Sequence, residues 1–222
     1  MSPRSPFVQL SSNRRRALRQ RARMLRRKGY RHIAGVDEAG AGPLAGPLVA
    51  AAVILPPRAR LPGADDSKTL SARARAYWAQ RIKGRAVASA IAIVSVAELD
   101  EIGPYQAAIQ AMERAVMKLT PQADYLLIDA RHLPRLHQPQ EAIVGGDGKH
   151  LAIAAASILA KVCRDAIMRR LDEDYPGYGF ARHKGYGTPA HLEALERLGP
   201  CPAHRCRYAP VRRLLEGQAR LF

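Results

Sequence analysis

The chain has 222 residues, of which 47% are hydrophobic and 5% aromatic, so one domain with an aliphatic core is expected. The sequence contains no apolar run long enough to cross a membrane, and its three cysteines are too few for a disulfide framework, which predicts a cytoplasmic protein. The formal net charge of +17 excludes an acidic protein and favours a polyanionic partner such as nucleic acid.

The positive charge is concentrated at the N-terminus. Residues 1–31 contain ten Arg, one Lys and no acidic residue, whereas the remainder contains 25 basic and 19 acidic residues. We therefore predict a basic, flexible arm over residues 1–30 that contacts nucleic acid, followed by a folded domain over residues 31–222. A disordered tail that only aids solubility is the alternative. The apolar stripe of the arm is too thin to favour a membrane surface.

After the arm, the hydrophobic pattern predicts alternating strands and helices. Apolar runs predict strands over 31–36, 48–55, 87–94 and 125–128, and a short one near 142–144. Helices are predicted from Ser71 towards Ile82, over 96–119 with a break at Gly103-Pro104, over 151–171 and over 189–198. Three successive strands favour an antiparallel meander, and strands joined through helices favour parallel additions. The expected fold class is therefore α/β, with a mixed five-stranded sheet flanked by helices.

Four acidic residues occupy unusual positions. Asp37 and Glu38 end the first strand, Asp129 ends the fourth, and Asp147 precedes the helix at 151. Carboxylates that converge at one edge of a sheet repel one another unless cations neutralise them, and Mg²⁺ or Mn²⁺ prefers such oxygen ligands. A pair of these ions is a device for phosphodiester hydrolysis. Each acid also has an ordinary alternative as a turn residue, an Asx-turn or, for Asp147, a helix N-cap, and sequence spacing leaves their convergence open.

A second cluster, Cys201, His204 and Cys206, has the residue types of a zinc site. A fourth ligand at standard spacing is missing, which favours a C-terminal loop with two free thiols.

The segment Gly35-Val-Asp-Glu-Ala-Gly-Ala-Gly-Pro-Leu-Ala-Gly-Pro47 closely resembles the N-terminal signature of bacterial ribonuclease HII. Further blocks match that family in the same order between Ile33 and Val211. They are Asp66-Ser-Lys68, Ile153-Ala-Ala-Ala-Ser-Ile-Leu-Ala-Lys161, Arg164-Asp165, Tyr175-Pro-Gly-Tyr-Gly-Phe180, His183-Lys-Gly-Tyr-Gly-Thr188, His204-Arg205 and Ala209-Pro-Val211. The resemblance implies an RNase H-like catalytic domain with a C-terminal helical appendage, and it does not extend to the basic arm.

The resemblance also implies an activity. It predicts a monomeric endonuclease that hydrolyses the RNA strand of RNA–DNA hybrids and cuts 5′ of single ribonucleotides in duplex DNA, leaving a 3′-hydroxyl and a 5′-phosphate. The implied cofactor is Mn²⁺ or Mg²⁺, and the implied catalytic and metal-binding carboxylates are Asp37, Glu38, Asp129 and Asp147. Asp165 competes for the fourth place, but its position four residues after Lys161 favours a structural Lys–Asp pair.

The family reads the 2′-hydroxyl of RNA through the backbone of a Gly-Arg-Gly turn and through a tyrosine, which correspond here to Gly40, Ala41, Gly42 and Tyr186. Ser67, Lys68 and Lys184 are further candidate substrate-binding residues. Ala41 stands where arginine is usual, and losing a charge-assisted phosphate contact there would weaken binding by about 1.5–3 kcal/mol. We hypothesise that the basic arm compensates. Two other departures are the stretch Ile102-Gly-Pro-Tyr105 and Asp129-Ala130, where Asp-Gly is common.

Two other functions fit the same charge and acids. A different RNase H-like nuclease acting on DNA alone should lack the sugar-reading glycines and tyrosine. A non-catalytic nucleic-acid-binding protein should have lost some of the four acids, all of which are present here. Metal-dependent cutting discriminates an enzyme from a binding module.

Overall fold

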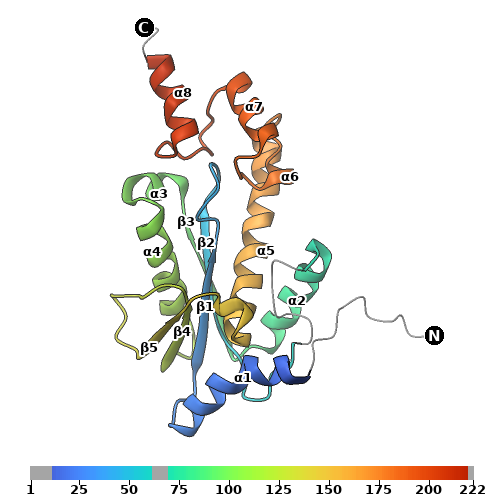
Figure 1. The fold of residues 1–222 in the computed structure, drawn as a ribbon, viewed down its shortest axis with the longest axis vertical. Coiled ribbons are helices and arrows are strands. Elements are labelled where there is room, and N and C mark those ends of the chain that lie inside the picture. Colours follow the sequence, from blue (N-terminus) through green and yellow to red (C-terminus); the bar gives the residue numbers. More distant parts are fainter. Residues whose placement is uncertain (1–11, 62–69, 220–222) are drawn as a thin grey trace, which may run out of the picture.

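The structure is a computed structural model that describes residues 12–61 and 70–219. Its centre is a five-stranded sheet in the order β3-β2-β1-β4-β5 (Figure 1). The strands are β1 (Ile33–Ala39), β2 (Leu48–Ile54), β3 (Ala88–Val94), β4 (Tyr125–Asp129) and β5 (Gln140–Ile143). The first three strands pair antiparallel, whereas β4 runs parallel to β1 and β5 runs parallel to β4. The predicted meander with parallel additions is confirmed.

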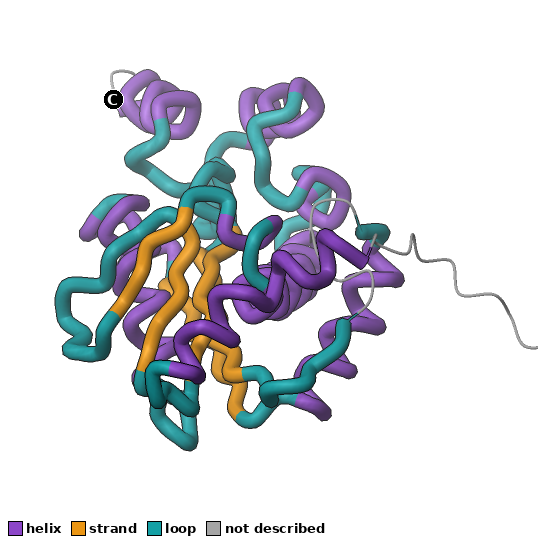
Figure 2. Tube along the Cα trace, turned by 60° about the horizontal axis from the view of Figure 1, so that its bottom comes forward, coloured by secondary structure: helices purple, strands orange, loops and turns teal. Residues whose placement is uncertain are grey.

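Helices cover both faces of the sheet. One face carries α4 (Pro104–Met117), and the other carries α5 (Leu151–Asp174), with α2 (Ala72–Arg85) packed against α5 (Figures 1 and 2). Alternate residues of β2 enter different cores, so that Leu48 packs on the α4 side and Val49 on the α5 side. Because both faces of β2 are buried, its sequence is continuously apolar rather than alternating.

The predicted helix boundaries follow from local capping. The Ser71 side chain accepts a hydrogen bond from the backbone N–H of Ala74 and caps α2, as predicted. The long helix expected over 96–119 is broken into α3 (Val96–Ile102) and α4 at Gly103, which has a φ of 81° and precedes a proline at the start of α4. Glycine adopts a positive φ without strain, and proline is well accommodated in the first turn of a helix, so the sequence predicts this break.

The C-terminal region forms the predicted helical appendage. It comprises α6 (Phe180–His183), α7 (Pro189–Leu198) and α8 (Ala209–Ala219), which lie beyond one end of the sheet, at the top of Figure 1. Phe180, Leu195 and Val211 bury their side chains in a core of their own, which also includes Leu44 and Ala45 from the loop between β1 and β2. The appendage is thereby attached to the segment that follows β1.

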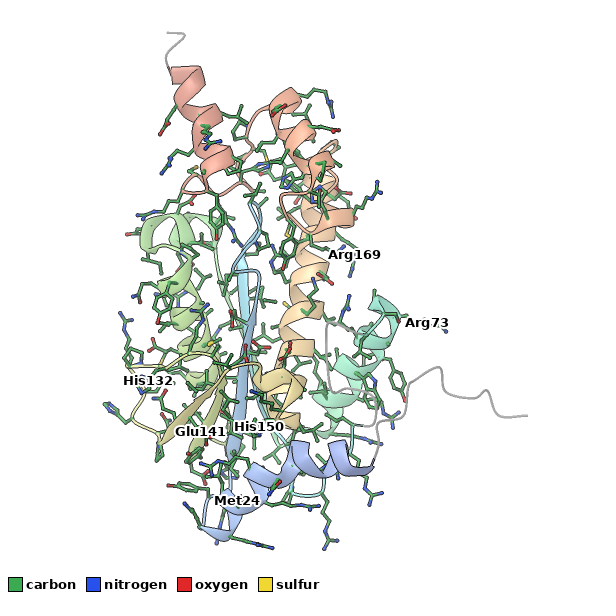
Figure 3. All side chains as sticks on the ribbon, viewed as in Figure 1. Met24, Arg73, His132, Glu141, His150 and Arg169 are labelled. Atoms are coloured by element: carbon green, nitrogen blue, oxygen red, sulfur yellow. The ribbon has the colours of Figure 1, made fainter. Side chains whose placement is uncertain are left out.

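Residues 1–11 of the expected flexible arm lie outside the described residues, and the part that the structure describes is helical and packed on the domain. Residues 12–27 form a helix, α1 (Ser12–Arg27), and Leu25 is only 2% exposed in a cluster with Ile33, Leu127 and Ile153. Arg21 forms an ion pair of 2.7 Å with Glu141 of β5, which Figure 3 shows at the same end of the molecule as Met24. The boundary expected near residue 30 therefore separates α1 from β1 in sequence but not in packing. No helix in the described ranges has both the length and the apolar composition needed to cross a bilayer.

Candidate active site

A cavity of about 460 Å³ opens at the carboxyl end of β1. Its walls include Asp37, Glu38 and Asp129, together with the Gly40–Gly42 turn and Tyr186. The parallel register pairs Val36 of β1 with Ile128 of β4. The residues that follow them, Asp37 and Asp129, therefore lie side by side, on the face of the sheet opposite to Val36 and Ile128. The structure thus brings together three of the four acids predicted from sequence.

Asp37 is the most confined of these carboxylates. It is 5% exposed, its Oδ1 accepts a hydrogen bond of 2.7 Å from the backbone N–H of Glu38, and Ser157 of α5 donates a further hydrogen bond. Burial, followed by the negative charges of Glu38 and Asp129, raises the pKa of Asp37 well above its ordinary value. The site therefore places three carboxylates close together, one of them buried.

The fourth acid, Asp147, reaches the site indirectly. Asp129 Oδ1 accepts a hydrogen bond of 2.6 Å from the N–H of Gly146, which ties β4 to the short helix η1 (Gly146–Gly148). Asp147 is buried in η1 and its Oδ1 accepts from the N–H of Gly148, but its side chain does not line the cavity. The alternative role as N-cap of α5 is wrong, because His150 occupies that position.

The donor chemistry fits a divalent cation, although the side chains are not gathered around one point. Within residues 12–61 and 70–219, no three His, Cys, Asp or Glu side chains are arranged to hold a single ion as they stand. Glu38 instead forms an ion pair of 3.4 Å with Arg131. All four candidate donors are carboxylates, which suit Mg²⁺ or Mn²⁺. Burial and the neighbouring charges of Glu38 and Asp129 raise the pKa of Asp37, and a bound cation would counter both effects.

Asp165 is held in a different environment. Its carboxylate lies 2.8 Å from Lys161 Nζ and 3.7 Å from Arg75 Nη2, and its side chain is buried. The predicted structural pair with Lys161 is confirmed.

Two buried arginines hold the loop between β1 and β2. Arg205 donates to the carbonyl oxygens of Gly40 at 2.6 Å and Gly46 at 2.9 Å, and it also bonds Ala41. Arg164 donates to the carbonyls of residues 45, 47 and 184 at 2.9–3.0 Å. In so basic a chain a single arginine is expected to be an exposed charge, so the sequence did not predict a structural role for either residue. The only signal was their position in the motifs that resemble the family.

Tyr186 lies beside the glycine turn and is 47% exposed. A Cβ built on Gly42 would lie 3.9 Å from the Tyr186 ring, so the two predicted sugar-reading elements face the same space. The Tyr186 carbonyl accepts a 2.9 Å hydrogen bond from Nδ1 of His191, whose Nε2 lies 3.1 Å from Nε2 of His204.

The tautomers of this pair follow from their neighbours. The N–H of Cys201 donates to Nδ1 of His204, so His204 carries its proton on Nε2 and donates to His191. Burial lowers the pKa of both histidines, for His204 to about 4. Two neutral imidazoles therefore connect the C-terminal loop to the backbone of Tyr186.

The remaining candidates lie elsewhere. Lys184 adopts a φ of 55°, its ammonium donates to the carbonyl of Ala181, and it does not line the cavity. Ser67 and Lys68 lie outside the described residues. The Cys201 thiol contacts His204, while the backbone N–H of the exposed Cys206 bonds Asp100, as expected for a loop rather than a zinc site.

The sheet order, the helix-covered faces and the acids at the paired ends of β1 and β4 define an RNase H-like nuclease fold. Ribonuclease H2 from Pyrococcus horikoshii OT3 shares it, with a TM-score of 0.74 and 25% identity, over 83% of this chain and 97% of that one. Bst-RNase HIII in complex with Mn²⁺ has the same fold, with a TM-score of 0.69 and 19% identity over 86% of this chain and 71% of that one.

The chain belongs to the ribonuclease HII family, whose sequence model matches residues 34–211. Ribonuclease HII of Geobacillus kaustophilus is 53% identical over 193 residues, which cover 87% of this chain and 74% of that protein. The protein is thus an endoribonuclease of the ribonuclease H class, a phosphodiester hydrolase.

Proposed function

We propose that this protein hydrolyses the RNA strand of RNA–DNA hybrids and cuts 5′ of single ribonucleotides embedded in duplex DNA. The observation that carries the proposal is one cavity shared by Asp37, Glu38 and Asp129 with the Gly40–Gly42 turn and Tyr186. The acids supply a hydrolytic centre, and the turn and tyrosine supply a surface for the sugar. A nuclease that reads DNA alone has no need of the second surface.

Asp37, Glu38, Asp129 and Asp147 would hold two divalent cations, Mn²⁺ or Mg²⁺. When bound, such ions activate water and stabilise the leaving 3′-oxygen, which yields a 3′-hydroxyl and a 5′-phosphate. Asp37, which is buried beside the charges of Glu38 and Asp129, would be one of the residues that hold these ions. The Mn²⁺ complex of Bst-RNase HIII, which has the same fold, supports a divalent cation here.

Sugar recognition is assigned to the backbone of Gly40, Ala41 and Gly42 and to the ring of Tyr186. Glycine lets a backbone approach a sugar closely, and an aromatic ring can stack on a neighbouring deoxyribose. Arg205 fixes the turn through its carbonyls, and His191 fixes Tyr186 through its carbonyl. This recognition needs no side chain at Ala41. We assign no substrate contact to Lys184.

We further propose that α1 contacts the nucleic acid away from the cleavage site. Arg23, Arg27, Lys28 and Arg31 are exposed along and just after this helix. Because α1 packs on Ile33, at the start of β1, and the strand extends about 3.3 Å per residue, α1 lies roughly 20 Å from the end of β1. It therefore suits phosphates flanking the site rather than the phosphate that an arginine at position 41 would contact. We place this enzyme in the cytoplasm as a monomer.

A labelled DNA duplex with one ribonucleotide tests the proposal. It is incubated with the protein in Mg²⁺, in Mn²⁺ and in chelator, beside an all-DNA duplex and a continuous RNA–DNA hybrid. We expect metal-dependent cutting 5′ of the ribonucleotide and within the hybrid's RNA strand, abolished by Asp129→Asn. Cutting of the all-DNA duplex would favour a DNA nuclease, and binding without cutting in either metal would favour a binding protein.

A further inference from the structure

Arg131 lies at the edge of the candidate active site and contacts one of its acids. Its Nη2 is 3.4 Å from Glu38 Oε1, and both side chains are largely buried, at 19% and 15% exposure. The guanidinium carbon lies 5.0 Å from the centre of the Tyr105 ring, at the start of α4. A cation between an aromatic face and a carboxylate is held from two sides.

The backbone turns Arg131 towards this position. Ala130 has a φ of 52°, a left-handed conformation that side-chain-bearing residues rarely adopt. Its N–H bonds the carbonyl of Ile143, which holds the turn against β5. His132, which follows Arg131, is exposed on the outer side of the loop (Figure 3). Unfavourable backbone angles at a site edge are retained where the surroundings fix them.

Arg131 does not line the cavity itself but contacts Glu38, which does, and the cations that line the cavity are bound to other parts of the protein. Lys161 and Arg75 pair with Asp165, and Arg164 donates to three backbone carbonyls. Arg131 differs, because its ionic partner is a carboxylate that the proposed function assigns to a metal ion. Once a cation neutralises Glu38, the guanidinium has the charge and the position to bind an anionic group of the substrate.

We propose that Arg131 is a substrate-phosphate-binding residue, held by Tyr105 and paired with Glu38 until a divalent cation binds. This inference rests on the proposed function and deepens it. It supplies, from the end of β4, the cationic phosphate contact that Ala41 does not make. Tyr105 and Ala130, which belong to two of the three departures of this chain, then form one arrangement with Arg131.

The test measures binding of a duplex with one ribonucleotide by fluorescence anisotropy in Ca²⁺, across a salt series, with no cleavage needed. Arg131→Ala should weaken binding about tenfold and lower the slope of log K against log salt by about 1, the value for one lost phosphate contact. Arg131→Lys should restore the slope. Tyr105→Phe should behave as the wild type, and Tyr105→Ala should lose affinity. Lys118→Ala, an exposed cation after α4, removes an equal charge and should leave the slope unchanged.

A second readout uses the protein without substrate. Calorimetric titration with Mn²⁺ should show several-fold tighter binding to Arg131→Ala, because Glu38 no longer has a competing cation. A wild type that cuts 5′ of the ribonucleotide, while Arg131→Ala keeps its salt slope, would overturn this inference alone. Equal slope changes in Lys118→Ala would overturn it too, since the effect would be one of net charge. A wild type that neither binds nor cuts the duplex would refute the proposed function and this inference together.

Discussion

Replacing Gly40 with alanine should destabilise the protein far more than the same change at Gly29. Both glycines have nearly the same backbone angle, with φ of 102° and 101°. A Cβ at Gly29 would meet no atom within 4 Å, whereas a Cβ at Gly40 would lie 2.1 Å from Nε and 2.5 Å from Cδ of Arg164. The two variants therefore share the backbone strain and differ in the displacement of one buried arginine.

The expected magnitudes follow from these contacts. A left-handed alanine costs about 1–2 kcal/mol, which is the whole effect at Gly29. At Gly40 the Arg164 side chain must also move, although it donates to the carbonyls of Ala45, Pro47 and Lys184. Breaking one hydrogen bond of a buried charged group costs about 1.5–3 kcal/mol more. We expect a total loss of about 3–5 kcal/mol in the free energy of unfolding.

Urea denaturation followed by circular dichroism measures both variants, with the m-value confirming a common unfolding reaction. A double-mutant cycle with Arg164→Ala isolates the clash, because this variant lacks the Cδ and Nε atoms that the new Cβ would meet, so Gly40→Ala should then cost no more than Gly29→Ala. Equal destabilisation of the two glycine variants in the wild-type background would refute the reasoning. It would mean that Arg164 can give up its hydrogen bonds to the carbonyls without lowering the free energy of unfolding.

Three further outcomes are expected. Leu25→Ala should lower the free energy of unfolding by about 2–5 kcal/mol, whereas Met24→Ala, whose side chain is 43% exposed, should have little effect; equal losses would argue against docking of α1 through Leu25. Asp37→Asn should abolish cleavage yet raise the melting temperature of the metal-free protein at neutral pH, because a neutral amide avoids the burial of a charge and the repulsion from Glu38 and Asp129, which together raise the pKa of Asp37; a lower melting temperature would count against those causes. His204 takes up a proton more readily when unfolded, since its pKa falls from 6.5 to about 4 in the fold. Stability should therefore decrease as pH drops from 6.5 towards 4, by about 2–3 kcal/mol at pH 4.5 from this group, and denaturation of His204→Gln should show a correspondingly shallower pH dependence.

The elements of the fold were predictable because each has a local cause. Continuous apolar runs marked β2 and β4, a serine marked the start of α2, and Gly103-Pro104 marked the break before α4. These signals depend only on neighbours in sequence. The mixed sheet then followed from the order of strands and helices.

The geometry of the site was less accessible from sequence. Asp37 and Asp129 meet only because Val36 pairs with Ile128 in a parallel register, and a shift by one residue would turn one carboxylate to the other face. The docking of α1 depends on one leucine, Leu25, among cations, which is too weak a pattern to distinguish from an exposed helix. The pairing of Arg131 with Glu38 depends on the left-handed backbone conformation of Ala130, which an alanine in the sequence does not predict.

The hydrogen bond from Arg205 to the carbonyl of Gly40 joins residues 165 positions apart. A ribosome synthesises the chain from its N-terminus, so all four acids have been added when Asp147 is complete, long before residue 205. A nascent chain of that length thus contains the four candidate carboxylates without the guanidinium that fixes the glycine turn. Because the glycine turn, to which we assign sugar recognition, is held by an arginine that is synthesised 165 positions later, we expect a nascent chain that ends before residue 205 to lack the proposed discrimination between RNA and DNA.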